Sequence, residues 1–131
     1  MSETSSMHRI FVVDGDRSVA MTLVRILTHG GYDATPFTDS TEALLAANLN
    51  APRLVLADAN MPSISGIDLA VEVRQCAPDC QVLLMSGALT QIDLLGPRKA
   101  CGFEFEVLEK PLGIGDLLGK VQCLIGEGKP A

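Results

Sequence analysis

The stretch Leu54-Val55-Leu56-Ala57-Asp58-Ala59-Asn60-Met61-Pro62 decides the fold of this chain. It opens with four apolar residues that run directly into the carboxylate of Asp58. Asn60 and Pro62 then prevent a regular element from continuing. A short apolar run bounded by turn residues is typical of a strand that is buried on both faces. In an open parallel sheet, ligands bind outside the carboxyl ends of the strands, so Asp58 would lie where ligands bind.

Outward from this stretch, predicted strands and helices alternate along the chain. The apolar and β-branched runs predict strands over residues 8–13, 32–37, 54–58, 81–85 and 103–108, the second of them at an edge. The helical periodicity predicts helices after Asp16 or Ser18, after Asp39 or Ser40, and over residues 67–75, 90–100 and 114–125. This alternation indicates a doubly wound α/β fold, with three layers and a five-stranded parallel sheet.

Composition limits the classes of partner that the chain can bind. It has 131 residues and a net charge of -6, which disfavours direct contact with nucleic acid or with an anionic membrane surface. It contains no apolar run near the ~20 residues of a membrane span, and its first residues lack the features of a signal peptide. We therefore expect a cytoplasmic protein. One domain is predicted over residues 7–126, with a flexible tail at 1–6 and a flexible tail or truncated linker at 127–131.

The four cysteines do not form a recognisable metal-binding pattern. No Cys-x-x-Cys pair is present, and the two histidines do not lie at ligand spacing from the cysteines. We interpret all four thiols as reduced packing residues, because a disulfide between Cys76 and Cys80 is disfavoured in an intracellular chain.

Polar side chains follow four of the predicted strands. Asp14-Gly15-Asp16 follows the first strand, Asp58 ends the third, Ser86 ends the fourth, and Lys110 follows the fifth. Because parallel strands place their carboxyl ends at one edge of the sheet, these side chains are expected to lie close together. An isolated Asp after a strand is more often a turn cap, and the full set argues against that interpretation here.

This set of side chains suits phosphoryl transfer. Clustered carboxylates are ligands that Mg²⁺ prefers, and the metal neutralises charge on a phosphoryl group. A lysine ammonium supplies a compact positive charge, and a serine hydroxyl can donate a hydrogen bond to a phosphoryl oxygen. A carboxylate can itself be the nucleophile and become an aspartyl-phosphate.

The chain also resembles the receiver domain of bacterial two-component response regulators, which has the CheY-like (flavodoxin-like) fold. The resemblance covers residues ~8–125, and it rests on Phe11-Val12-Val13-Asp14, on Leu56-Ala57-Asp58-Ala59-Asn60-Met61-Pro62 with Gly66, on Leu84-Met85-Ser86-Gly87-Ala88, and on Glu109-Lys110-Pro111. It implies the strand order 2-1-3-4-5. It also implies a phosphoprotein that switches protein–protein contacts and is not an enzyme beyond Mg-dependent self-phosphorylation and slow autodephosphorylation.

The resemblance assigns a role to each matching residue. Asp58 matches the phosphoacceptor, which takes a phosphoryl group from a histidine kinase or a histidine phosphotransfer protein and signals to a downstream protein partner. Asp14 matches an acidic metal ligand, and Asn60 matches the residue whose backbone carbonyl binds Mg²⁺. Ser86 matches the switch hydroxyl, and Lys110 matches the lysine that pairs with the acceptor.

Two positions depart from the pattern of the family. Gly15 stands where a second acidic metal ligand is usual, so we expect weakened Mg²⁺ affinity. Asp16 would either reach the metal or cap the helix that follows by accepting hydrogen bonds from its backbone N–H groups. Val107 stands at the switch position that is often aromatic, which puts signalling through an aromatic side chain in doubt.

Two alternative functions compete with the phosphoacceptor. Gly15 favours a pseudo-receiver, which would be an interaction module that works without phosphorylation. Asp14-Gly15-Asp16 after a buried strand also resembles the Asp-x-Asp motif of haloacid-dehalogenase-type phosphatases, in which Asp14 would be the nucleophile. That reading would leave the Asp-x-x-Met-Pro motif at Asp58 without a purpose.

Overall fold

The computed structural model describes residues 8–59, 61, 65–86, 106–110 and 112–128. Along the chain, these residues form β1 (Arg9–Val13), α2 (Arg17–His29), β2 (Asp33–Phe37), α3 (Ser40–Leu49), β3 (Leu54–Asp58), α4 (Gly66–Cys76), β4 (Gln81–Ser86), β5 (Glu106–Glu109) and α6 (Ile114–Ile125). The helix predicted over residues 90–100 lies outside the described residues, as do the first three residues of the strand predicted over 103–108.

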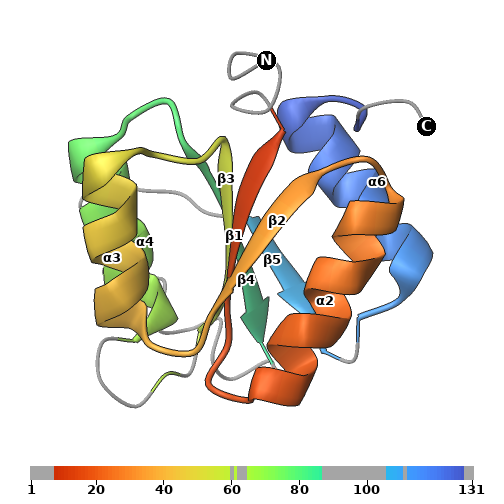
Figure 1. Ribbon diagram of the computed structural model, residues 1–131, viewed down its shortest axis with the longest axis horizontal. Coiled ribbons are helices and arrows are strands. Elements are labelled where there is room, and N and C mark those ends of the chain that lie inside the picture. Colours follow the sequence, from red (N-terminus) through yellow and green to blue (C-terminus); the bar gives the residue numbers. More distant parts are fainter. Residues whose placement is uncertain (1–7, 60, 62–64, 87–105, 111, 129–131) are drawn as a thin grey trace.

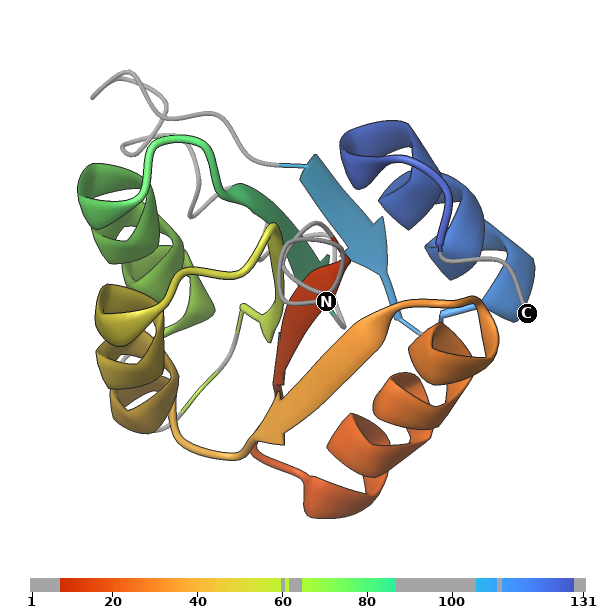
Figure 2. The same cartoon turned by 45° about the horizontal axis from the view of Figure 1, so that its top comes forward.

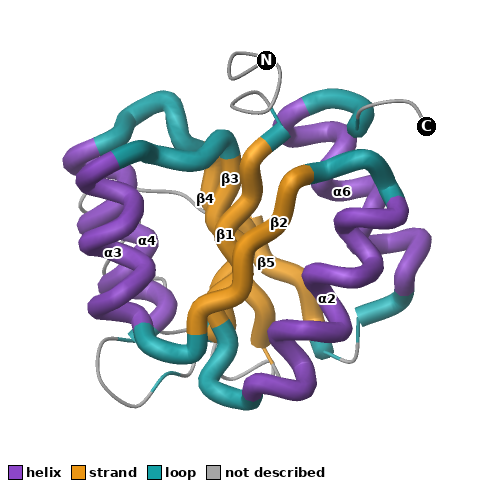
Figure 3. The backbone as a smooth tube through the Cα atoms, in the orientation of Figure 1, coloured by secondary structure: helices purple, strands orange, loops and turns teal. Residues whose placement is uncertain are grey.

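The five strands form one parallel sheet in the order β2-β1-β3-β4-β5. The doubly wound fold and the strand order expected from the sequence are therefore confirmed, and β2 lies at an edge as predicted. Helices α3 and α4 cover one face of the sheet, and α2 and α6 cover the other (Figures 1 and 2). The result is three layers, with the strands twisted between the two pairs of helices (Figure 3).

Local sequence signals determine where the helices begin. The Asp16 carboxylate accepts hydrogen bonds from the backbone N–H groups of Ser18 and Val19 at the start of α2. Asp39 accepts from the N–H of Thr41 in the same way at the start of α3. These bonds satisfy donors that the first turn of a helix leaves without a partner, so each cap fixes the first residue of its helix.

The core consists of two apolar layers, one on each face of the sheet. The layer under α3 and α4 includes Phe11, Val55 and Leu84, and the layer under α2 and α6 includes Ile10, Leu56 and Leu83. Alternate residues of each strand therefore enter opposite layers, as the pleat of a strand requires. Both faces of β3 are buried, which confirms the interpretation of its apolar run.

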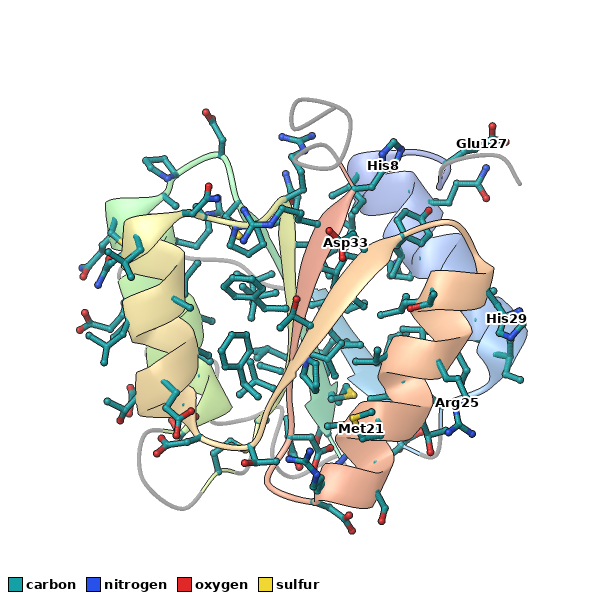
Figure 4. All side chains as sticks on the ribbon, viewed as in Figure 1. His8, Met21, Arg25, His29, Asp33 and Glu127 are labelled. Atoms are coloured by element: carbon teal, nitrogen blue, oxygen red, sulfur yellow. The ribbon has the colours of Figure 1, made fainter. Side chains whose placement is uncertain are left out.

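A short segment after α6 packs against the amino-terminal end of the sheet. The Tyr32 hydroxyl donates to the carbonyl of Gly126 at 2.6 Å, and a ring nitrogen of His8 lies 3.1 Å from the carbonyl oxygen of Glu127. His8 and Glu127 lie together at this end in Figure 4. A Cβ atom on Gly128 would overlap the carbonyl group of Gly30, so only glycine fits there. Residues 126–128 thus contact the domain closely.

None of the helices in the described part of the chain has the length and apolarity needed to span a membrane.

The three cysteines that the structure describes, Cys76, Cys80 and Cys123, are free thiols, and burial raises the pKa of Cys80 to about 12. Cys101 lies outside the described residues.

Candidate functional site

Four of the side chains predicted to act together lie at the carboxyl ends of four neighbouring strands. Asp58 and Ser86 are the last residues of β3 and β4, and Asp14 and Lys110 directly follow β1 and β5. Asp14 and Ser86 are each 2% exposed, so both residues are enclosed by the surrounding structure. This edge of the sheet lies at the bottom of Figure 1, where α2 begins.

Lys110 joins two of these strand ends through its ammonium group. Its Nζ donates to Asp58 Oδ2 at 2.9 Å and to Asp14 Oδ2 at 3.3 Å. The backbone N–H of Lys110 also donates to the carbonyl of Ser86 at 2.7 Å, which continues the pairing of β5 with β4 beyond the strand itself. The lysine side chain therefore starts from a fixed backbone and reaches across the sheet edge to the two carboxylates.

The charge of Lys110 is stabilised by this arrangement. Partial burial of Lys110 opposes its charged form, but the hydrogen bond to Asp58 and the negative charges of Asp58 and Asp14 outweigh that effect. The pKa of Lys110 is consequently raised from its ordinary value. The ammonium thus stays charged near neutral pH, beside the carboxylate that would receive a phosphoryl group.

Asp14 is held on both of its carboxylate oxygens. Asp14 Oδ1 accepts the backbone N–H of Asp16 at 2.9 Å, while Oδ2 faces Lys110. The neighbouring carboxylate of Asp16 instead accepts the N–H groups that open α2. Of the two roles considered for Asp16, the structure thus shows the helix cap.

Gly66 brings the first turn of α4 against the backbone of Asp58. A Cβ atom at Gly66 would overlap the carbonyl group of Asp58 and would lie 2.8 Å from the Cα of Ala59. The N–H of Gly66 donates to the carbonyl of Ala59 at 3.2 Å, and the N–H of Ala59 donates to the carbonyl of Met85 at 2.8 Å. The first turn of α4 lies so close to the backbone of Asp58 that no side chain fits between them. This contact explains why a glycine stands eight positions after Asp58.

Comparison with known proteins agrees with this geometry. Residues 10–122 match the family described as the response regulator receiver domain. The chain belongs to this family.

Relatives and solved structures extend the match. The chain is 34% identical over 126 residues to the response regulator MprA of Mycobacterium sp. (strain KMS), and the aligned region covers 93% of this chain and 52% of MprA. It is 29% identical over 117 residues to the transcriptional regulatory protein PrrA of Mycobacterium tuberculosis, and this alignment covers 89% of this chain and 49% of PrrA. The chain thus spans about half the length of these curated relatives.

Two solved structures share the fold. The receiver domain protein from Clostridium thermocellum has a TM-score of 0.79 and 27% identity, over 89% of this chain and 93% of that one. The chemotaxis protein CheY4 of Vibrio cholerae has a TM-score of 0.80 and 24% identity, over 90% of this chain and 98% of that one. The comparisons give no support to the pseudo-receiver or to the phosphatase alternative.

Receiver domains generally bind Mg²⁺ for phosphorylation, and the donors at this edge fit that ion. The described residues include no group of three His, Cys, Asp or Glu side chains that could hold a metal. The carboxylates here are those of Asp14 and Asp58, while Gly15 is exposed and adds no ligand. Mg²⁺ is often held by one or two carboxylates together with phosphate oxygens and waters, so two carboxylates are compatible with this ion.

Other predicted site residues lie elsewhere or outside the described part. Val107 lies in β5 opposite Leu84 and packs against the apolar layer under α3 and α4. Asn60 and Pro111 fall outside the described residues. Sequence reasoning missed the contact between Lys110 and Asp14, for which no local signal exists.

Proposed function

We propose that Asp58 of this receiver domain is the phosphoacceptor and that the donor is a phosphohistidine on a histidine kinase or a histidine phosphotransfer protein. A carboxylate oxygen of Asp58 attacks the phosphorus atom. A P–O bond forms while the P–N bond breaks, and the electron pair of the P–N bond stays on the imidazole nitrogen. The product is an aspartyl-phosphate on this chain.

The observation that carries this proposal is the bridge from Lys110 to Asp58 and Asp14. The bridge holds a positive charge 2.9 Å from an Asp58 oxygen before any phosphoryl group arrives. A charge fixed in advance stabilises the negative charge of the transferring group without reorganisation during the step. Ser86, at the end of the neighbouring strand, supplies the hydroxyl that would donate to a phosphoryl oxygen.

The carboxylates of Asp14 and Asp58, with the backbone carbonyl of Asn60 implied by the family pattern, would hold Mg²⁺. When bound, the ion offsets the negative charge on the phosphoryl oxygens. Asp14 is suited to this position because its carboxylate is already oriented by the N–H of Asp16 and by Lys110.

Phosphorylation then acts as a switch on protein contacts. It adds roughly -1.5 to -2 charges and three acceptor oxygens at Asp58. Ser86 and Lys110 respond to that charge, and β5 with Val107 carries the change to a downstream protein partner. The chain catalyses only its own phosphorylation from small donors and its own slow dephosphorylation, and it works in the cytoplasm.

Intact-mass measurement after incubation with acetyl phosphate tests this function. With Mg²⁺ we expect one added phosphoryl group, mapped to Asp58, and none without the metal. Asp58→Asn should abolish the modification, because an amide is a poor nucleophile. Asp14→Asn should keep it but should raise the Mg²⁺ concentration needed, since one carboxylate ligand is lost.

Two other outcomes would contradict this function and would favour one of the alternatives. No modification at any Mg²⁺ concentration would leave the pseudo-receiver as the better explanation. A phosphoryl group that survives Asp58→Asn but disappears in Asp14→Asn would instead support the phosphatase-type nucleophile.

A further inference from the structure

A pocket of about 510 Å³ lies beside the candidate phosphorylation site, on the face of the sheet covered by α2 and α6. One wall comes from the first three turns of α2, and the rest comes from Met85 of β4, Lys110 and Leu112. This volume lies within the range of small-molecule binding sites, which is roughly 300–1,000 Å³. Asp58 is not part of the lining, so the pocket adjoins that site without containing it.

The lining is mostly apolar. Val19 and Ile26 are half-buried residues of α2 that lie at helical spacing from the buried Leu23 and Leu27, and both line the pocket. Met85 and Leu23 are buried and complete an aliphatic lining. The Thr22 hydroxyl, which also faces this region, already donates to the carbonyl of Ser18 at 2.9 Å. An occupant would therefore gain contact with aliphatic groups and few hydrogen bonds.

The charges around the pocket favour a neutral occupant. Lys110 is the charged residue of the lining, and its ammonium is held by Asp58 and Asp14. Two carboxylates against one ammonium leave a local charge of about -1, which repels anions, and the mostly apolar lining opposes the burial of a cation. The ammonium is turned toward the carboxylates, so the alkyl chain of Lys110 is the part left to contact an occupant.

We propose that this pocket binds a neutral, largely apolar small molecule. Such a molecule would bury the aliphatic side chains of α2 together with the alkyl chain of Lys110, and removal of that surface from water would drive binding.

N-phenyl-1-naphthylamine, a neutral apolar dye whose fluorescence rises in apolar surroundings, is a suitable probe. We expect saturable binding to the unphosphorylated protein. Thr22→Phe, which places a ring in the pocket, should weaken the affinity about tenfold or more, which is about 1.4 kcal/mol. Thr28→Phe is the matched control, because Thr28 is also an exposed threonine of α2 but does not line the pocket. Its affinity should equal that of the wild type.

A further control addresses apolar surface elsewhere. Leu49 on α3 is 89% exposed and lies on the other face of the sheet, so Leu49→Ser should leave dye binding unchanged. Absence of saturable binding would overturn the proposal, as would equal affinities for Thr22→Phe and Thr28→Phe or loss of binding in Leu49→Ser.

The readout is independent of phosphorylation, so the two proposals fail separately. If acetyl phosphate never modifies the protein, the phosphoacceptor function fails while dye binding stands. If the dye fails to bind while acetyl phosphate modifies Asp58, the pocket proposal fails while the phosphoacceptor function stands.

Discussion

The Lys110 ammonium lies 3.3 Å from Asp14 Oδ2, although the two residues are 96 positions apart in the sequence. The contact joins the residues that follow the interior strand β1 and the edge strand β5, and it passes over the carboxyl ends of β3 and β4. Asp14 is nearly inaccessible to water, so its carboxylate depends on this cation and on the Asp16 N–H for compensation. Lys110 thus has a structural role as well as the chemical one proposed.

Replacement of Lys110 by methionine should destabilise the protein at neutral pH. The variant leaves the buried Asp14 carboxylate without its cation, at a cost of about 1–3 kcal/mol. The pKa of Lys110 is raised on folding, so its contribution is complete below the ordinary lysine value near 10.5 and is lost as pH rises through the raised value. Urea unfolding should therefore show a gap between wild type and Lys110→Met that is constant at neutral pH and narrows above about pH 10.5.

The control for Lys110→Met is Arg25→Met. Arg25 is an exposed cation of α2, shown in Figure 4, and its loss removes the same charge without affecting the site. If both variants have the same stability at pH 7, the bridge to Asp14 contributes nothing to folding.

Gly15→Asp should tighten Mg²⁺ binding. The substitution adds a carboxylate next to Asp14, and affinity for hard cations rises with the number of charged ligands. Among the described glycines, positive φ angles occur at Gly31 and Gly126, so the backbone at position 15 accepts a side chain without strain. We expect about a tenfold lower Kd by isothermal titration calorimetry, and Gly15→Asn, of similar size but uncharged, should not reach it. Equal Kd values for these two variants would show that the added charge is not a ligand.

Gly66→Ala should destabilise the fold and displace the candidate site. Its Cβ would overlap the Asp58 carbonyl, so the first turn of α4 must move, at a cost of about 1–3 kcal/mol. Gly119→Ala is the control, because a Cβ there meets nothing within 4 Å and alanine favours the helix α6 by about 0.5–1 kcal/mol. Thermal unfolding should move in opposite directions for the two variants. A Gly66→Ala protein as stable as the wild type would contradict the close packing.

The described cysteines should differ in their reaction with iodoacetamide. Cys76 and Cys123 are exposed, whereas burial raises the pKa of Cys80 to about 12. The thiolate is the reactive form, so peptide mapping after labelling at pH 8.5 should find the first two alkylated and Cys80 intact. In urea all three should react. Labelling of Cys80 in the native protein, at a rate similar to that of Cys123, would show that the strand end at β4 opens readily.

The parts of the fold that could be predicted depend on local chemistry. Asp16 and Asp39 are capping residues before apolar-periodic segments, so the starts of α2 and α3 followed from a few neighbouring residues. The apolar run before Asp58 similarly predicted a strand buried on both faces. Alternation then gave the parallel sheet and brought the polar residues to one edge.

The parts that could not be predicted depend on distances across the fold. The bridge from Lys110 to Asp14 requires side-chain conformations on two strands that do not pair with each other. The pocket arises because Val19 and Ile26 have the same periodicity as core residues, and periodicity does not reveal whether a facing element fills the space. Gly66 was recognised through a family motif, but its overlap with the Asp58 carbonyl requires coordinates.

The close contact of Gly128 with Gly30 holds residues 126–128 at the amino-terminal end of the sheet. His8 and Glu127 lie at that end in Figure 4, whereas Asp14 and Asp58 lie at the carboxyl ends of β1 and β3. The five residues of β1 separate the two ends by roughly 17 Å. Phosphorylation at Asp58 would therefore influence residues 126–128 through displacement of the intervening strands and helices, over the full height of the sheet.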